Sequence, residues 1–96
     1  MRVRYTPRAR DDLEAIFHYL DQVSPSAARS IKHTLERRIG LLGDIPFMAP
    51  ATSEIGVYEL SIVRYPYKVY YRVENEEVRI VHIRHTSRRS PDVGEL

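Results

Sequence analysis

Apolar positions in the first half of the chain recur every three or four residues, a spacing that places them on one face of a helix. The first run follows Thr6–Pro7 and consists of Ala9, Leu13, Ile16, Phe17 and Leu20. The second follows Ser24–Pro25 and consists of Ala28, Ile31, Leu35, Ile39 and Leu42. In both, a hydroxyl residue able to cap a helix precedes a proline at the first helical position. The pattern predicts two amphipathic helices joined by a short turn, the second ending at Gly43 as its C′ residue.

The second half of the chain has the composition and alternation of β-strands. Residues 57–65, residues 68–74 and the run from Glu77 are rich in valine, isoleucine and tyrosine, and residues 2–5 alternate between polar and apolar. Asn75–Glu76 offers a tight turn between the last two runs. These elements predict an α+β fold of order β-α-α-β-β-β, in which a helical hairpin packs on a small, mostly antiparallel sheet.

Composition limits the kinds of protein this chain can be. A length of 96 residues with 43% hydrophobic and 29% charged residues predicts one globular domain spanning residues 1–96. The chain contains no cysteine, which excludes disulfides, thiolate metal sites and cysteine nucleophiles. No apolar run approaches the roughly 20 residues that cross a bilayer, and the N-terminus lacks a signal-peptide pattern. We therefore expect a cytoplasmic protein that does not associate with a membrane.

Charge is distributed unevenly, although the net charge is only +2. From Arg79 to Arg89 there are four arginines and no acidic residue, and the same segment holds His82 and His85. Residues three apart on a strand face opposite sides, so the two histidines should neither act as a pair nor bind one metal ion. We expect His82 at an exposed strand position and His85 partly buried at the sheet edge. Alternation breaks at Ile80–Val81, and a β-bulge there would decide which face His85 takes.

Four sequence pieces in a fixed order extend over most of the chain. The opening VRYTPRARDDLEAIFHYL contributes Thr6, Ala9, Asp12, Leu13, Ile16 and Tyr19, and the second helix opens with Pro25, Ala27 and Ala28. The strand segments contribute Glu59, Leu60, Tyr65, Pro66, Tyr67, Val69, Tyr71, Arg72 and Val73, and the last piece contributes Ile83, His85, Arg88 and Pro91. Each piece alone is weak. Taken together in this order, however, the four pieces make the chain resemble the RelE/ParE superfamily of bacterial toxins from type II toxin–antitoxin modules.

The resemblance implies a toxin that a co-expressed antitoxin binds and silences in a hetero-oligomeric complex, without a cofactor or metal. Which residues contact the antitoxin is left unassigned. Two activities are open within the superfamily. The RelE branch cuts messenger RNA on the ribosome, whereas the ParE branch poisons DNA gyrase and is not known as a nuclease.

RNA cleavage through the 2′-hydroxyl needs a base, an acid and cations that stabilise the developing phosphate charge. By resemblance to the RelE branch, Lys68 stands where that branch has a strand arginine, and Arg88 is one residue from its late arginine. The late tyrosine of that branch falls near Val93 and is absent. The alternative catalytic set is therefore His85 with Lys68, Arg72 or Arg88. Because this set is incomplete, gyrase inhibition by binding is the first hypothesis, ribosome-dependent mRNA cleavage the second and a degenerate, non-toxic interaction module the third.

The basic C-terminal segment is the predicted surface for the macromolecular target. The residues assigned to it are Arg72, Arg84, His85, Arg88 and Arg89. Arg72 falls on the same strand face as Lys68 and Tyr70, which is expected to be exposed, so these side chains could also be no more than the solvated face of a strand.

Overall fold

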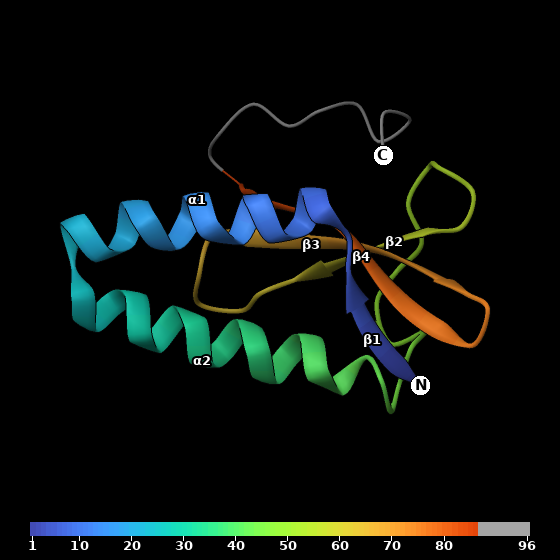
Figure 1. The fold of residues 1–96 in the computed structure, drawn as a ribbon. Coiled ribbons are helices and arrows are strands. Elements are labelled where there is room, and N and C mark those ends of the chain that lie inside the picture. Colours follow the sequence, from blue (N-terminus) through green and yellow to red (C-terminus); the bar gives the residue numbers. More distant parts are fainter. Residues whose placement is uncertain (87–96) are drawn as a thin grey trace.

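Within residues 1–86, which the computed structural model describes, four strands and two helices follow in the order β-α-α-β-β-β (Figure 1). Their bounds are β1 Arg2–Tyr5, α1 Pro7–Val23, α2 Pro25–Leu41, β2 Val57–Ser61, β3 Tyr67–Glu74 and β4 Glu77–His85. The predicted α+β fold and its element order are confirmed.

Both helices begin where the local sequence predicts. Thr6 Oγ1 accepts a hydrogen bond from Ala9 N at 3.2 Å, and Ser24 Oγ accepts one from Ala27 N at 3.3 Å. Each cap satisfies a backbone N–H that has no partner within its helix. Thr6 Oγ1 also donates to the carbonyl of Ile80 at 2.9 Å, so the first cap fixes α1 to strand β4 as well.

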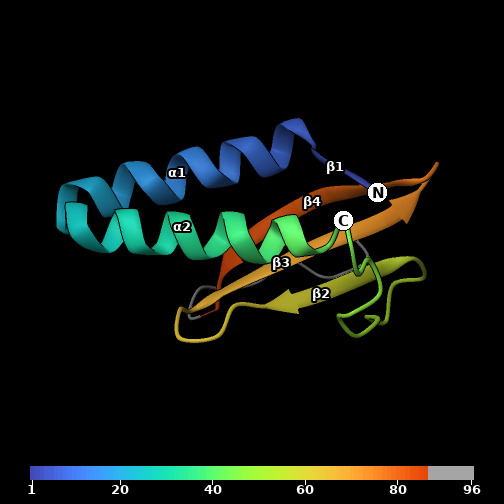
Figure 2. The same cartoon turned by 90° about the horizontal axis from the view of Figure 1, so that it is seen from below.

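The sheet has the strand order β1-β4-β3-β2 and is antiparallel except for the parallel pair β1 and β4 (Figure 2). Strand β1 pairs with Glu77–Ile80 alone. The second half of β4 therefore has no strand partner on that side, and its backbone N–H groups there need other acceptors.

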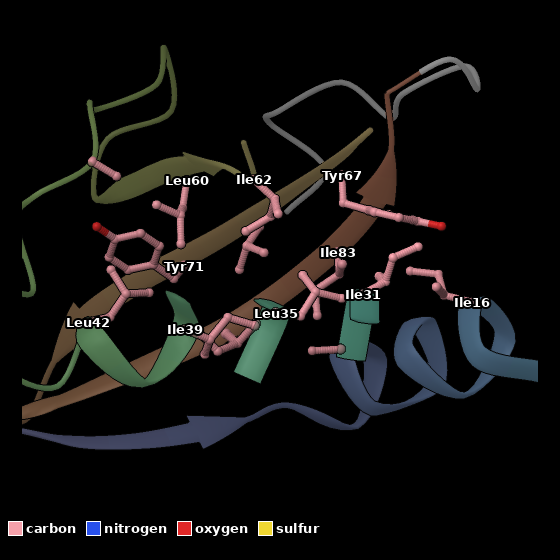
Figure 3. Packing of buried hydrophobic residues seen from close by; sticks show 14 of the residues in the cluster. Ile16, Ile31, Leu35, Ile39, Leu42, Leu60, Ile62, Tyr67, Tyr71 and Ile83 are labelled. Carbon is pink, nitrogen blue, oxygen red and sulfur yellow. The ribbon is translucent and has the colours of Figure 1, made fainter. Parts of the chain in front are cut away.

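The core lies between the helical hairpin and one face of the sheet, as Figure 3 shows. Leu35 and Ile39 of α2 are 1% and 2% exposed and belong to the same cluster as Val69 and Tyr71 of β3, both 0% exposed. A side chain of this size contributes about 1.5–3 kcal/mol on burial. The apolar stripes of the two helices are thus matched by the odd-numbered positions of β3.

Residues 44–56 connect α2 to the sheet and are held down by aromatic side chains. Phe47 meets the ring of Tyr58 edge to face and Tyr58 stacks on Tyr71, with ring centroids 5.5 Å and 5.4 Å apart. The hydroxyl of Tyr71 donates to the carbonyl of Pro46 at 2.8 Å. Burial raises the pKa of Tyr71, an effect that a backbone hydrogen bond from Ala49 partly opposes. Tyr71 therefore anchors this loop in its protonated form.

The turn between β3 and β4 has the predicted position. Asn75 and Glu76 have φ angles of +53° and +59°, the combination of a type I′ turn. Asparagine tolerates this left-handed conformation, whereas glutamate adopts it at a cost.

One local prediction was wrong. The strand expected over residues 57–65 ends at Ser61, because the chain turns through Arg64, whose φ is +79°. Gly43 directly follows the C-cap Leu42 and is the C′ residue as predicted, but it does so without a positive φ, which among the described glycines belongs to Gly56. A Cβ at Gly43 would lie 2.7 Å from the Met1 carbonyl, so glycine is needed for the close approach of the N-terminus.

Neither helix in the described part of the chain is long and apolar enough to cross a membrane.

Candidate functional site

The predicted cationic residues of β3 and β4 lie on the outer face of the sheet, meaning the face opposite the one that carries Val69 and Tyr71. Residues opposed across neighbouring strands share a face. The registers place two rows of side chains there, Glu59 with Tyr70 and His82, and Ser61 with Lys68 and Arg84.

One carboxylate organises these side chains into what we call the Glu59 network, consisting of Glu59, Lys68, Tyr70 and Arg84. Glu59 Oε2 lies 3.3 Å from Lys68 Nζ, and Glu59 Oε1 accepts from the Tyr70 hydroxyl at 2.8 Å. Arg84 Nε in turn donates to that hydroxyl at 3.1 Å. The network offsets the charge of Lys68 and fixes the orientation of Arg84.

Tyr70 is the centre of the outer face and not an exposed side chain, which corrects the prediction. It is only 3% exposed, and it lies outside the core cluster. The guanidinium carbon of Arg84 is 5.9 Å from its ring centroid, within cation–π range. The ring of His82 stacks on its ring, with centroids 5.9 Å apart and an interplanar angle of 17°.

Arg72 lies on the same face but one row away, opposite Val57 and Arg79. Its Nη1 donates to the carbonyl of Ile55 at 3.3 Å, so this arginine stabilises the loop before β2. The structure does not bring Arg72 into the Glu59 network.

The Asp12–His82 pair was not predicted from the sequence. Asp12 Oδ2 accepts from His82 Nδ1 at 2.7 Å and from the backbone N–H of Ile83 at 3.0 Å. The carboxylate on α1 therefore takes the place of a missing strand partner along the open half of β4. His82 is 7% exposed instead of being an exposed strand residue, and its Nε2 is buried without a partner.

A register shift in the β3–β4 pairing between Tyr70 and Tyr71 confirms the predicted irregularity, with Val81 as the extra residue of β4. Beyond it, His82 pairs with Tyr70 and His85 with Tyr67, so the two histidines face opposite sides as predicted. His85 is partly buried and meets the ring of Tyr67 edge to face at 5.3 Å. Its imidazole thus lies on the face opposite to the side chains of Lys68 and Arg84, although Arg84 Nη1 donates to the His85 carbonyl at 3.4 Å.

Arg88 and Arg89, the remaining predicted target-binding residues, lie outside the described residues. Within residues 1–86, no three histidine, aspartate or glutamate side chains are grouped so that they could hold a metal ion.

An apolar groove of about 350 Å³ lies beside the helical hairpin. It is lined by Tyr5, Arg10, Leu13, Phe17, Leu35, Glu36 and Ile39. Burial raises the pKa of Tyr5, and the negative charge of Glu36 raises it further. The groove is therefore apolar along its length, with one cationic and one anionic side chain among its lining residues.

Comparison with known proteins gives two sequence matches. A protein-family model described as "ParE toxin of type II toxin-antitoxin system, parDE" matches residues 3–90. A Caulobacter vibrioides protein named Toxin RelE2 is 38% identical over 90 residues, which are 91% of this chain and 97% of that protein.

Two solved structures share the fold. A chain of the chromosomal ParDE toxin–antitoxin system from P. aeruginosa superposes with a TM-score of 0.77 at 24% identity, covering 91% of this chain and 97% of that chain. A chain of the Mycobacterium tuberculosis toxin–antitoxin complex RelBE2 gives a TM-score of 0.59 at 24% identity, covering 88% and 95%.

Proposed function

This chain belongs to the ParE toxin family of type II toxin–antitoxin systems, and from that premise we propose that it arrests growth by binding DNA gyrase and not by cutting RNA. Its general role is that of a toxin with an antitoxin partner. The proposal concerns the target, together with action in the cytoplasm, where that target is found.

The state of Lys68 is the observation that supports binding over cleavage. A nuclease would need its ammonium group free to stabilise the charge that develops on a phosphate. Instead, Lys68 Nζ is paired at 3.3 Å with Glu59, and both side chains are more than two-thirds buried. A phosphate approaching this position would meet the Glu59 carboxylate as well as the cation, and like charges repel.

Messenger RNA cleavage stays as the second candidate because the Caulobacter relative bears the name Toxin RelE2. For this chain, the histidine nearest the network is His82, whose Nε2 is buried and has no hydrogen-bond partner. A general base must come within hydrogen-bond reach of the substrate proton, so His82 would have to become accessible before it could act.

Expression in cells from an inducible promoter separates the two candidates. We expect plasmid supercoiling to change while messenger RNA stays intact by primer extension, and co-expression of the cognate antitoxin to restore growth. Discrete mRNA breaks with unchanged supercoiling would contradict the proposal.

The predicted target contact is tested with the double variant Arg88→Ala, Arg89→Ala. We expect it to lose growth arrest and to keep antitoxin binding, because removing two cations weakens attraction to an acidic surface. The matched control is Arg8→Ala, Arg29→Ala, which makes the same charge change at two exposed helix positions. Equal toxicity of the two double variants would exclude Arg88 and Arg89 from the target contact.

For the antitoxin, we propose that an amphipathic helix packs in the apolar groove beside α1 and α2. Both solved relatives are toxin–antitoxin structures, and a groove lined by Leu13, Phe17 and Ile39 suits the apolar face of such a helix. The variant Arg10→Glu should weaken antitoxin binding about tenfold by altering a charge that lines the groove. The control Arg8→Glu reverses an exposed charge outside the groove, and equal affinity of the two variants would contradict this placement.

A further inference from the structure

A second hollow, of about 330 Å³, lies between the C-terminal half of α2 and the connection from β2 to β3. Figure 2 shows this connection below α2. The hollow is lined by Thr34, Arg37, Arg38, Val63, Arg64 and Tyr65. We call it the arginine hollow, because three of its six lining residues are arginines and none is acidic.

These three arginines differ from several cations of the sheet. Arg4, Lys68 and Arg79 each have a carboxylate partner within 4.0 Å. Among the described residues, the side chains of Arg37, Arg38 and Arg64 have no such ion pair, and Arg38 Nε is buried without any hydrogen-bond partner. A buried donor without an acceptor is costly, so a ligand that draws the Arg38 side chain toward the hollow and gives Nε an acceptor would remove this cost.

The backbone at Arg64 supports a role for its side chain. With a φ of +79°, this residue occupies the left-handed region, where glycine is favoured. Residues in such strained conformations persist only where the surrounding structure holds them, and they cluster at binding sites, where a side chain must be held in one position. An exposed arginine in this position faces the hollow from the side opposite to Arg37 and Arg38 of α2.

The number of guanidinium groups indicates the ligand. One carboxylate has two oxygens and is matched by a single arginine fork, whereas a phosphate group offers three or more acceptor oxygens to several forks. The partial negative charge at the C-terminus of α2, about half an elementary charge, is small beside three full positive charges. From these observations we propose that the arginine hollow is a binding site for a phosphate group.

This site is separate from the Glu59 network, and the proposal does not depend on the toxin's target. The phosphate could belong to a nucleic-acid backbone or to a free phosphorylated small molecule. The two sources share the chemistry that three guanidiniums recognise, so the experiment includes a probe for each.

The test follows the side-chain Nε–H signals of the arginines by NMR while the full chain is titrated with inorganic phosphate. We expect the signals of Arg37, Arg38 and Arg64 to shift together, with the signal of Arg29 unchanged. A labelled single-stranded oligoribonucleotide is titrated in parallel by fluorescence anisotropy.

Variants give the decisive comparison. Arg64→Gly removes one guanidinium but relieves the positive φ, so thermal stability should rise while phosphate affinity falls about tenfold. Arg38→Gln should weaken binding to a similar extent, and Arg29→Ala, which makes the same charge change as Arg64→Gly, should have less than about a twofold effect.

Oligoribonucleotide binding that is lost in Arg64→Gly would support the site and identify a nucleic-acid backbone as the source. Phosphate binding without oligoribonucleotide binding would support it with a small phosphorylated molecule as the ligand. The proposal is overturned if phosphate shifts none of the three signals, if Arg29→Ala weakens binding as much as Arg64→Gly, or if an acidic polyglutamate peptide is the sole probe bound.

Discussion

Removing the Asp12 carboxylate should destabilise the protein far more than its partly exposed position on α1 suggests. The change Asp12→Ala deletes the acceptor for His82 Nδ1 and for the backbone N–H of Ile83, and leaves a histidine that is 7% exposed with no partner on either ring nitrogen. Hydrogen bonds to charged groups contribute about 1.5–3 kcal/mol each. The Asp12 side chain is 21% exposed, so water recovers part of this loss. We therefore expect the free energy of unfolding to fall by about 2–4 kcal/mol.

The assay is urea and thermal unfolding of the purified chain followed by circular dichroism, with Asp11→Ala as the control. Asp11 is the exposed neighbouring residue, and its loss should change stability by less than about 0.5 kcal/mol. For a domain of this size the Asp12→Ala midpoint should fall by at least about 8 °C. The unfolding midpoint of Asp12→Asn, which keeps an uncharged acceptor, should lie between those of Asp12→Ala and Asp11→Ala. Hydrogen exchange of the Ile83 amide should accelerate in Asp12→Ala. If Asp12→Ala and Asp11→Ala unfold at the same temperature, the carboxylate does not hold β4 in the way described.

Two further predictions concern backbone strain and alkaline pH. Glu76→Gly should raise the free energy of unfolding by about 0.5–1 kcal/mol in urea titrations, because glycine adopts the φ of +59° without strain, and a decrease would contradict the turn geometry. Because the folded-state pKa of Tyr71 is raised above its ordinary value of 10.0, its contribution to stability is complete below about pH 10 and is lost as the pH rises through the folded-state pKa. The free energy of unfolding, measured below and above that pKa, should therefore fall less in Tyr71→Phe than in the unaltered chain. Equal falls in the two proteins would contradict a pKa of Tyr71 raised by burial.

Local features of the fold could be predicted because their causes are local. The caps at Thr6 and Ser24 depend on residues three positions away, and the turn at Asn75–Glu76 depends on its own two residues. The break in alternation at Ile80–Val81 likewise lay in the sequence, and it correctly indicated the bulge that sets the face of His85.

The candidate site was less predictable because its contacts join distant residues. Asp12 and His82 are 70 positions apart, and nothing near His82 in the sequence shows that a helix supplies its partner. The burial of Tyr70 could not be predicted either. Strand alternation places its side chain on the outer face but does not show that other side chains cover it there. Gly43 ends α2 as predicted, but the sequence could not show that the chain's own N-terminus approaches it closely.

Gyrase as the target is tested most directly by the ATP-dependent supercoiling of relaxed plasmid by purified DNA gyrase in the presence of this chain. We expect inhibition that rises with toxin concentration and is reversed by the cognate antitoxin, while messenger RNA on programmed ribosomes stays uncut at the same concentrations. Full supercoiling activity together with cleavage of the ribosome-bound message would exclude gyrase as the target.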